Sequence, residues 1–496
     1  MALITIDIGT SVAKVAAFDD SGRAQAEAHV TYPTQRPQPG WAEQDPDDWW
    51  KAVCRATRSV VRQLSTSKAN IEGIGLTGQM HGLVLLGRTG NPLIPCLIWM
   101  DTRAENCARK LCESLGETLF LSRTGNPIVP AFPITKLLWV REHLPHIHKE
   151  TRWVVMPKDY LGFRLTGEIA TDPSDASGTL LYNSRLRDWD DELLAAVGVS
   201  RELLPPIKPS TSRLGKVTLQ AAKELRVPAG TPVVVGAGDL ATSALGVGAI
   251  TPERVGLILG TAGQLLFTLN EFPHQLLGRF YFFVHAIPES YLGLGTLPTG
   301  GAALAWLARV VWPSGSFEER KIEKLVNLAK TAPPGANGLF FLPYLAGTGT
   351  PYMDYKATGI LLGLTEAHGL KQIVRAVLEG VGYALRDSLQ LLQDFEIGQK
   401  EIMIAGGSMR SQLFRQIIAD ILGRPLQLVR VLDVSPLGAF LLTAVGLGLQ
   451  PNLRKACEAM IEVQEIIAPT EASRYYSEKF MDFRELSQKW RSQHQV

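Results

Sequence analysis

The hydrophobic pattern of this chain contains two short hairpin-like segments, one in each half. Apolar residues fill positions 3–6 and 12–18 around a first glycine-containing turn, and positions 255–259 and 265–269 around a second. Two apolar runs joined by a short turn with glycine predict an antiparallel pair of strands. We therefore expect two tight β-hairpins.

The rest of the first half alternates between helical and extended patterns. Helices are expected at about 47–64 and 104–115, and the apolar runs 73–77 and 83–86 between them have the length of strands. Interleaved strands and helices are typical of layered α/β folds. The sequence therefore predicts an α/β protein.

The second half continues the same alternation. Positions 370, 373, 374, 377, 378 and 381 are apolar and fall on one face of a helix. A strand is expected at 402–405 and a helix at 412–422. A last helix would carry Tyr476, Phe480 and Phe483 on one face. Each half therefore has the elements of an α/β domain of its own.

Length and composition favour two large domains. The chain has 496 residues, of which 46% are hydrophobic and 20% are charged. This length exceeds what a single hydrophobic core usually organises. Proline and glycine at 228–232, followed by the apolar run 233–235, place the domain junction near residue 246. We expect an N-terminal domain at 1–245, a C-terminal domain at 246–450 and a helical tail at 451–496.

Charge and hydropathy argue against several classes of protein. The net charge is +2 without a long basic run, so nucleic acid is not an expected partner. The longest apolar stretch, 437–449, is broken by glycine and falls short of the roughly 20 residues that a membrane span needs. The first residues lack the features of a signal peptide, so we expect a cytoplasmic protein without a membrane segment. Five cysteines without a CxxC pair favour free thiols over disulfides or zinc ligands.

The two turns are candidates for phosphate binding. The first contains Gly9, Thr10 and Ser11, and the second contains Gly260 and Thr261. Glycine lets the backbone approach an anion closely, and turn N–H groups and hydroxyls supply donors. The chain has neither a GxxxxGK[ST] nor a GxGxxG motif, so the turns themselves are the candidates. Glycine in a hairpin can also be required only by the conformation of the turn. Two such turns suggest two facing domains with a nucleotide between them.

Two aspartates occupy positions that suggest chemistry. Asp7 lies within the first apolar strand, where an ionised carboxylate is costly unless it meets a cation or strong donors. Asp239 follows the apolar run 233–235, so it is expected at the C-terminal end of a strand, where α/β sheets bind ligands. Asp7 is thus a candidate ligand for a metal on the nucleotide, or a hydrogen-bonded structural acid. Asp239 is a candidate catalytic group, or the N-cap of a helix at 240–245.

A third group of polar and aromatic residues follows the strands at 73–77 and 83–86. Its donors, acceptors and aromatic face suit a polyhydroxylated ligand, whereas a lone histidine beside apolar strands is more often a core residue. Its members are Gln79, His81, Trp99, Asp101 and Arg103.

Glycine pairs precede two helices in the second half. Gly406, Gly407 and Ser408 come after the expected strand at 402–405 and open the next helix, and Gly300 and Gly301 precede an apolar helix at 302–311. Small residues there would let a flat adenine ring lie against the backbone. Helix packing or capping would explain the same glycines.

Taken together, these residues resemble the FGGY carbohydrate kinases. Positions 133–143 are similar to the first signature of that family, with Ala131 where a bulkier residue, glycine or serine is usual. Positions 359–364 and 372–379 are similar to its second signature. The resemblance extends from residue 1 to about residue 450.

The resemblance implies a fold of two actin-like (ribonuclease H-like) ATPase domains with an interdomain catalytic cleft. The N-terminal domain would bind the sugar and supply Asp239 as catalytic base, and the C-terminal domain would bind ATP. The implied cofactors are ATP and Mg²⁺, with Asp7 and Asp239 at the metal. Phosphate and adenosine contacts would come from Gly9, Thr10, Ser11, Gly260, Thr261, Gly300, Gly301, Gly406, Gly407 and Ser408.

Within the family, two segments are similar to the pattern of xylulokinases. By that likeness the sugar pocket is lined by Gln79, Met80, His81, Gly82, Trp99, Asp101 and Arg103. The implied activity is that of a phosphotransferase with an alcohol group as acceptor, which moves the γ-phosphoryl group of MgATP to a terminal hydroxyl of a ketopentose. The implied substrate is D-xylulose, and the product is D-xylulose 5-phosphate.

Two departures from the family pattern concern the sugar site, at Leu240, and the second phosphate turn, at Ala262. Leu240 stands where xylulokinases usually have a sugar-binding asparagine, and Ala262 stands where serine is frequent in the second turn. A kinase for another ketose or polyol, such as ribulose, glycerol or a sugar alcohol, is therefore an alternative. An actin-like ATPase without a sugar pocket is the rival from another class. The expected partners are a small-molecule sugar and ATP, and a homodimer is compatible with the sequence.

Overall fold

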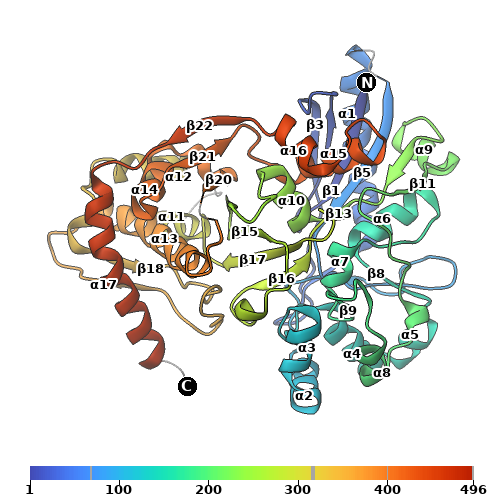
Figure 1. The fold of residues 1–496 in the computed structure, drawn as a ribbon, viewed down its shortest axis with the longest axis horizontal. Helices are drawn as coiled ribbons and strands as arrows, with labels where there is room; N and C mark the ends of the chain where they lie inside the picture. The colour runs from blue at the N-terminus through green and yellow to red at the C-terminus, as the bar shows by residue number, and fades with distance from the viewer. Residues whose placement is uncertain (68–69, 314–318, 399, 494–496) are drawn as a thin grey trace. The chain divides into compact units, whose positions relative to one another are not determined.

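The computed structural model describes residues 1–67, 70–313, 319–398 and 400–493 and divides into two compact units (Figure 1). Unit 1 comprises Met1–Gly246, Leu269–Leu292 and Val434–Met460. Unit 2 comprises Val247–Thr268, Gly293–Asp433 and Ile461–Val496. Each unit is therefore assembled from segments that are far apart in the sequence.

Unit 1 is built on a mixed sheet with the strand order β11–β12–β5–β1–β2–β3, and β13 also pairs with β5. β1 runs antiparallel to β2 and parallel to β5. The strands are β1 (Ala2–Ile8), β2 (Val12–Phe18), β3 (Ala24–Thr31), β5 (Ile71–Gly78), β11 (Arg213–Lys216), β12 (Pro232–Val234) and β13 (Ala237–Gly238). β1 and β2 confirm the first expected hairpin.

Every residue of β1 is buried, because helices cover both of its faces. Ile4 and Ile6 pack in one core with residues of α1 (Pro46–Ser67) and α6 (Pro157–Thr166). On the other side, α15 (Val434–Gly446) packs against β1 and β5. Successive strand side chains point to opposite faces, so Asp7 shares its face with Leu3 and Thr5 rather than with Ile4 and Ile6.

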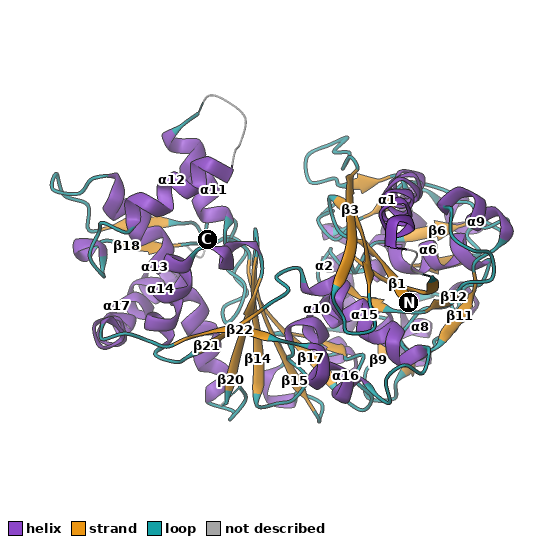
Figure 2. Cartoon of the chain, turned by 90° about the horizontal axis from the view of Figure 1, so that it is seen from above, coloured by secondary structure: helices purple, strands orange, loops and turns teal. Residues whose placement is uncertain are grey.

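Further short strands and helices complete unit 1 (Figure 2). The short strands are β4 (Glu43–Gln44), β6 (Val84–Leu86), β7 (Cys96–Leu97), β8 (Trp153–Val155), β9 (Tyr182–Asn183), β10 (Asp188–Trp189) and β16 (Tyr281–Val284). The helices are α2 (Glu105–Leu115), α3 (Glu117–Thr124), α4 (Pro133–His143), α5 (Pro145–Glu150), α7 (Pro173–Ser177), α8 (Asp191–Val197), η1 (Arg201–Leu203), α9 (Leu219–Leu225), α10 (Asp239–Val247), η2 (His274–Leu276) and α16 (Leu453–Met460).

Unit 2 repeats the central arrangement of unit 1. In its sheet, strands follow the order β17–β15–β14–β20–β21–β22. β14 runs antiparallel to β15 and parallel to β20, as β1 does with β2 and β5. The strands are β14 (Arg254–Leu259), β15 (Gly263–Leu269), β17 (Tyr291–Leu297), β20 (Glu401–Ala405), β21 (Leu426–Val429) and β22 (Val463–Ile467). β14 and β15 confirm the second expected hairpin.

The helices of unit 2 pack around α13 (Leu370–Gln393), which contacts α11, α12, α14 and α17. Tyr476, Phe480 and Phe483 of α17 are buried against Tyr383 of α13, which confirms the apolar face expected for the last helix. The remaining elements are α11 (Ala302–Val311), α12 (Glu319–Ala329), η3 (Ala336–Gly338), β18 (Phe340–Leu342), β19 (Ile360–Leu362), η4 (Gly407–Arg410), α14 (Gln412–Leu422) and α17 (Ala472–Gln493).

The helix expected at 412–422 is confirmed as α14, but the glycines expected to open a helix lie before its start. The glycine-rich segment 406–408 enters the short 3₁₀ helix η4 instead of opening α14. α14 begins after Ser411, whose hydroxyl oxygen accepts a hydrogen bond from the Phe414 N–H. A serine cap of this kind satisfies a free N–H of the first turn, and it sets the start of the helix beyond the glycines.

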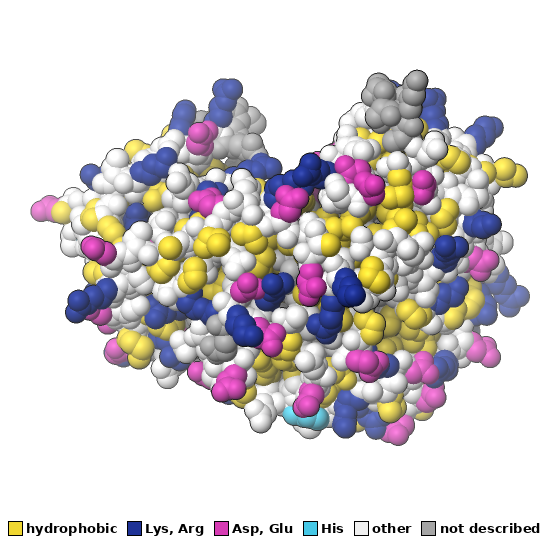
Figure 3. Space-filling model, turned by 45° about the horizontal axis from the view of Figure 1, so that its top comes forward, with side chains coloured by type: hydrophobic (Ala, Val, Ile, Leu, Met, Phe, Trp, Pro, Cys, Tyr) yellow, Lys and Arg dark blue, Asp and Glu magenta, His cyan; other side chains and the backbone are white. Residues whose placement is uncertain are grey.

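Three further observations concern the helices, the cysteines and the surface charge. No helix among the described residues is both long and apolar enough to cross a membrane. All five cysteines are free thiols, as expected. On the face drawn in Figure 3, Lys and Arg side chains lie among Asp and Glu side chains, so neither charge dominates that face.

Candidate active site

Strand pairing brings Asp7 and Asp239 together in unit 1. β1 and β13 both run parallel to β5, with Asp7 opposite Thr77 and Gly238 opposite Gly78. Asp239 follows Gly238 directly and is the first residue of α10. The desolvation of its carboxyl group, together with the negative charge of Asp7, raises the pKa of Asp239 to about 7. The two carboxyl groups therefore belong to one site.

Backbone and side-chain donors lie beside this acid pair. Backbone N–H groups of Leu240 and Met80 donate to Asp239, and these bonds oppose the rise of its pKa. Lys14 Nζ lies 3.9 Å from a carboxylate oxygen of Asp7. A carboxyl group whose pKa lies near neutral pH is suited to accept a proton during a reaction. Two neighbouring carboxylates also form a donor set of the kind that Mg²⁺ prefers.

The first glycine-threonine turn connects the end of β1 to β2. Gly9 N–H donates to Val12 O at 3.1 Å, which closes the turn, and the Tyr32 hydroxyl donates to Gly9 O. Two side chains then hold Thr10: Gln44 Nε2 donates to its carbonyl oxygen at 2.6 Å, and Trp99 Nε1 donates to its hydroxyl oxygen at 2.9 Å. The turn is therefore held from both sides, while Ser11 is exposed.

Three glycine segments meet around the second turn, in unit 2. Gly301 N–H donates to Gly260 O at 2.8 Å, and Gly300 N–H donates to Thr261 O at 3.1 Å. The Ser408 hydroxyl donates to Gly260 O at 3.4 Å. The structure thus brings together all the unit 2 residues that were expected at the nucleotide.

The glycines at this junction are required by close backbone contacts. A Cβ atom at Gly301 would lie 2.6 Å from Gly260 O. Gly406 has a φ of +98°, and a Cβ atom there would lie 2.5 Å from Leu259 O. A Cβ atom at Gly407, in contrast, would have nothing within 4 Å. The packing explanation therefore holds for Gly301 and Gly406, and Gly407 faces open space.

The segment after β5 carries residues expected at the sugar. Gln79 is buried, and its Nε2 donates to Gln44 Oε1 at 2.8 Å. His81 has a φ of +65°, its Nδ1 lies 2.8 Å from Gly178 O, and its ring packs against Phe132 and Phe283. Burial lowers the pKa of His81 to about 4, so the imidazole is neutral at physiological pH.

Met80 and Gly82 flank this histidine in the same segment. Met80 is buried, and a Cβ atom at Gly82 would lie 2.6 Å from Pro157 Cγ. Met80 also adjoins Gly238, because a Cβ atom at Gly238 would lie 2.6 Å from Met80 Cγ. The expected sugar segment therefore lies directly beside the strand that delivers Asp239.

Asp101 and Arg103 form a buried ion pair. Arg103 Nη2 lies 2.8 Å from Asp101 Oδ2 and 2.6 Å from Glu43 Oε1. The guanidinium carbon lies 3.6 Å from the ring centre of Trp41. Trp99 is different, since 45% of its surface is exposed. The ion pair therefore holds the neighbouring segments together, and Trp99 is the member of this group whose ring faces solvent.

The sequence did not identify three polar residues around the site. Gln44 is fully buried and uses its whole amide: it donates to Thr10 O and Thr34 Oγ1 and accepts from Trp49 Nε1 and Gln79 Nε2. Lys136 and Lys158 are also buried. Each lysine has apolar residues close by in the sequence, near the start of α4 or α6, and this was the signal that could have pointed to the two residues.

Lys158 lies in a cluster of acids behind β13. Its Nζ is 2.7 Å from Asp159 Oδ1, 3.3 Å from Asp172 Oδ1 and 3.4 Å from Asp175 Oδ2. Burial raises the pKa of Asp175 well above its ordinary value, although Lys158 opposes the shift. Ser174, which donates to Asp172, also accepts the Gly238 N–H at 3.0 Å. The cluster therefore fixes the strand that precedes Asp239.

Comparisons with known proteins match both halves of the chain to one family. The family model described as the FGGY family of carbohydrate kinases, N-terminal domain, matches residues 2–246, and the corresponding C-terminal domain matches residues 257–447. A xylulose kinase from Escherichia coli (strain K12) is 35% identical over 451 residues, which cover 91% of this chain and 91% of that protein. A xylulose kinase from Staphylococcus epidermidis is 32% identical over 480 residues, covering 96% and 95%.

Solved structures show the same fold. The crystal structure of a gluconate kinase from Lactobacillus acidophilus matches with a TM-score of 0.91 and 27% identity, over 98% of each chain. The similar proteins thus agree on the fold and on kinase chemistry, and their names include more than one sugar-derived substrate.

Proposed function

The chain belongs to the FGGY family of carbohydrate kinases, and from that premise we propose that it phosphorylates a ketopentose, most specifically D-xylulose to D-xylulose 5-phosphate. It is a phosphotransferase with an alcohol group as acceptor. The observation that carries the proposal is Asp239, which lies at the end of a strand, beside Asp7, with a pKa of about 7.

In this proposal Asp239 is the general base. A sugar hydroxyl is too weak an acid to be deprotonated fully by a carboxylate before the reaction. In a loose phosphoryl-transfer transition state, Asp239 need only orient the hydroxyl and accept its proton late. Positioned proton acceptors of this kind contribute about 10²–10⁴-fold to a rate. The backbone donors at Met80 and Leu240 hold the carboxylate in one orientation for that task.

Each of the two glycine-threonine turns is assigned, within its own unit, as a phosphate-binding element for ATP. Turn N–H groups and the Thr10 and Thr261 hydroxyls are suited to stabilise charge that develops on the transferred group. Mg²⁺ beside Asp7 would supply further neutralisation of phosphate charge. We assign the adenosine to Gly300, Gly301 and the segment 406–408, because Gly407 has open space at its Cα.

The sugar would be bound by the segment 79–82 and by Trp99. Neutral His81 donates through Nδ1 to Gly178 O, so its Nε2 can accept a hydrogen bond from a sugar hydroxyl. The exposed ring of Trp99 offers an apolar face to the C–H side of a sugar. Leu240 is buried beside Asp239 and cannot hydrogen-bond a substrate hydroxyl. Gluconate, ribulose and glycerol are therefore the competing substrates.

A substrate panel tests the proposal. The purified enzyme, with MgATP, would be assayed for ADP release with D-xylulose, ribulose, glycerol, a sugar alcohol and gluconate. We expect the highest kcat/KM with D-xylulose. A higher value with another substrate would correct the sugar and leave the kinase assignment intact. ADP release that no sugar or polyol stimulates would instead favour the actin-like ATPase.

A further inference from the structure

Lys136 of α4 makes an unusual set of hydrogen bonds. Its side chain is fully buried, and Nζ donates to three main-chain carbonyl oxygens: His81 O at 2.8 Å, Ile98 O at 2.8 Å and Leu97 O at 3.2 Å. An ammonium group has three N–H donors and no acceptor. Every donor of Lys136 is therefore directed at backbone.

Burying the Lys136 ammonium group costs free energy, which other interactions must offset. Burial lowers the pKa of Lys136 to about 7, and nearby Cys96 and Asp101 oppose that shift while Arg103 adds to it. The three carbonyl dipoles favour the ammonium form, since only that form has a donor for each of them. An apolar side chain of similar length would avoid the cost of burial but would leave three buried carbonyl groups without this partner.

The three carbonyl groups belong to two different segments. One is that of His81, whose positive φ is uncommon for a residue with a side chain. The other two belong to Leu97, the last residue of β7, and to Ile98, which lies between β7 and Trp99. Lys136 therefore joins the segment 79–82 to the segment 97–99, and both of them carry residues assigned above to the sugar.

We propose that Lys136 is a positioning residue for the acceptor sugar, which fixes His81 and Trp99 relative to each other through its three backbone hydrogen bonds. The inference rests on the proposed function for the identity of the ligand. It places Lys136 outside direct contact with substrate and gives it no part in proton transfer. Its loss should therefore affect sugar binding more than ATP binding or chemistry.

Steady-state kinetics test the selectivity of this effect. For Lys136→Met, we expect the KM for D-xylulose to rise about tenfold, which corresponds to the loss of roughly one strong hydrogen bond. The KM for ATP should change by less than about twofold. Lys136→Arg keeps several donors and should recover part of the sugar affinity. Equal changes in both KM values, or no change in either, would overturn the proposal.

Hydrogen exchange tests the same inference without relying on the sugar. The amides of Leu83 and Ile98 are good probes, because Leu83 N–H donates to Leu97 O and Ile98 N–H donates to Ala42 O. In full-length Lys136→Met these amides should exchange faster, while the amides at 260–263 should exchange at the same rate as in the unaltered protein. Unchanged exchange at Leu83 and Ile98 would contradict the positioning role even if no sugar were turned over.

A matched control separates positioning from general stability. Lys158 is equally buried in the same unit, but its ammonium group binds carboxylates rather than the 79–82 and 97–99 segments. Lys158→Met should lower the thermal midpoint without selective exchange at Ile98. If Lys136→Met does not fold, Lys136→Arg and Lys136→Gln provide the same comparison with donors retained. A failure of the substrate panel would reject the proposed function alone, because the exchange result does not depend on it.

Discussion

The indole N–H of Trp99 donates a hydrogen bond of 2.9 Å to the hydroxyl oxygen of Thr10. This bond links the exposed aromatic ring assigned to the sugar with the first glycine-threonine turn assigned to phosphate. Gln44 adds a second link, because it binds both Thr10 O and the side chain of Gln79. The residues assigned to the two substrates therefore share one hydrogen-bonded framework in unit 1.

Replacement of Trp99 by phenylalanine tests the value of that bond. Trp99→Phe keeps an aromatic face but removes the N–H donor, so we expect the KM for sugar to rise about fivefold, as for one hydrogen bond of roughly 1 kcal/mol. The control is Trp189→Phe, which removes an indole bond to Pro205 O elsewhere in the unit. That variant should leave KM unchanged, and an equal effect of both variants would count against a specific role for Trp99.

The pH dependence of catalysis should report Asp239. A base must be deprotonated to act, so kcat/KM should fall as the pH decreases through about 7. Asp7→Asn removes a negative charge that raises this pKa, so the acid limb of the kcat/KM profile should move to lower pH. In the same variant, the rate should depend less strongly on the Mg²⁺ concentration. Asp239→Asn should lower kcat by about 10²-fold or more. An acid limb that stays in place in Asp7→Asn would contradict the electrostatic coupling of the two acids.

Ionised Asp239 should also lower the free energy of unfolding at alkaline pH. Its folded pKa lies above the value of about 3.9 expected for the unfolded chain, so the folded protein binds the proton more tightly. The resulting penalty is complete above pH 7 and disappears below the unfolded pKa. Asp239→Asn should thus raise the thermal midpoint at pH 8 by the equivalent of about 2 kcal/mol, and less at pH 5.5. A variant that is less stable than the unaltered protein at pH 8 would argue for a structural role.

The glycines of unit 2 allow packing and ligand contact to be separated. Gly406→Ala should destabilise the protein by about 1–3 kcal/mol, because the φ of +98° and the Leu259 carbonyl oxygen both oppose a side chain. Gly407→Ala meets no protein atom, so its thermal midpoint should be unchanged. If adenosine binds there, the KM for ATP should nevertheless rise in Gly407→Ala. An unchanged KM for ATP would remove Gly407 from the nucleotide site.

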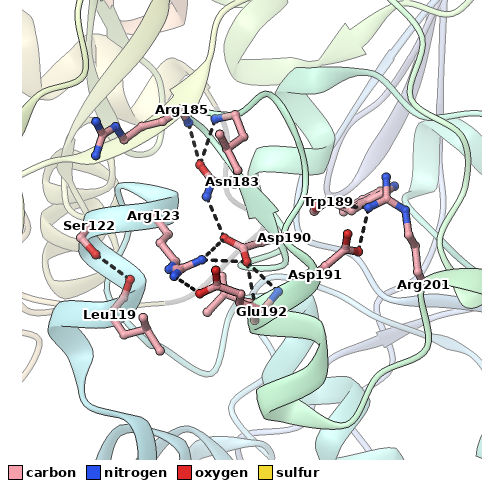
Figure 4. Close-up of polar contacts among 12 residues, drawn as sticks. Leu119, Ser122, Arg123, Asn183, Arg185, Trp189, Asp190, Asp191, Glu192 and Arg201 are labelled. Carbon is pink, nitrogen blue, oxygen red and sulfur yellow. Dashed lines mark hydrogen bonds and ion pairs between the residues drawn. The ribbon is translucent and has the colours of Figure 1, made fainter.

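Asp190 provides a stability test away from the site (Figure 4). It caps α8 by accepting the Glu192 and Leu193 N–H groups, and it also binds Arg123 and Asn183. Burial alone would raise its pKa, but these bonds hold the pKa below its ordinary value. Asp190→Ala should therefore cost about 2 kcal/mol at neutral pH with activity retained.

The pH dependence of stability and the neighbouring residue Asp191 provide two checks on the role of Asp190. The stabilisation by Asp190 should be present above the unfolded pKa of about 3.9 and be lost as the pH falls through the lower, folded value. Asp191→Ala alters an exposed acid that binds Arg201, and it should change stability by less than about 1 kcal/mol. Equal losses in both variants would show that capping is not the source of the effect.

The sequence predicted the local parts of the fold well. Both hairpins, α1, α13, α14 and α17 follow from the local sequence pattern. Asp7 was recognisable as an acid within an apolar strand, and Asp239 as an acid that follows an apolar run. Such features depend on neighbours along the chain. They are therefore visible without tertiary structure.

The supporting residues could not be predicted for a physical reason. Lys136 and Gln44 bind main-chain carbonyl groups that lie far away in the sequence, at His81, Ile98 and Thr10. Every residue has a carbonyl group, so nothing in the partner's identity reveals the contact. The bond from the Ala42 N–H to Asp101 was hidden for a similar reason, since every residue except proline has such a donor. The Arg103 side chain is close in sequence, but the ion pair fills acceptor sites of Asp101 that the sequence left open to a sugar.

The placement of α15 has a consequence for biosynthesis. This helix covers β1 and β5, yet it lies near the end of the chain, with Thr242 bound to Ser435 at 3.0 Å. A nascent chain that has emerged only to residue 246 still exposes the apolar side of its central strands to solvent. The first half of the protein can therefore complete its hydrophobic core only after α15, near the end of the chain, has been synthesised.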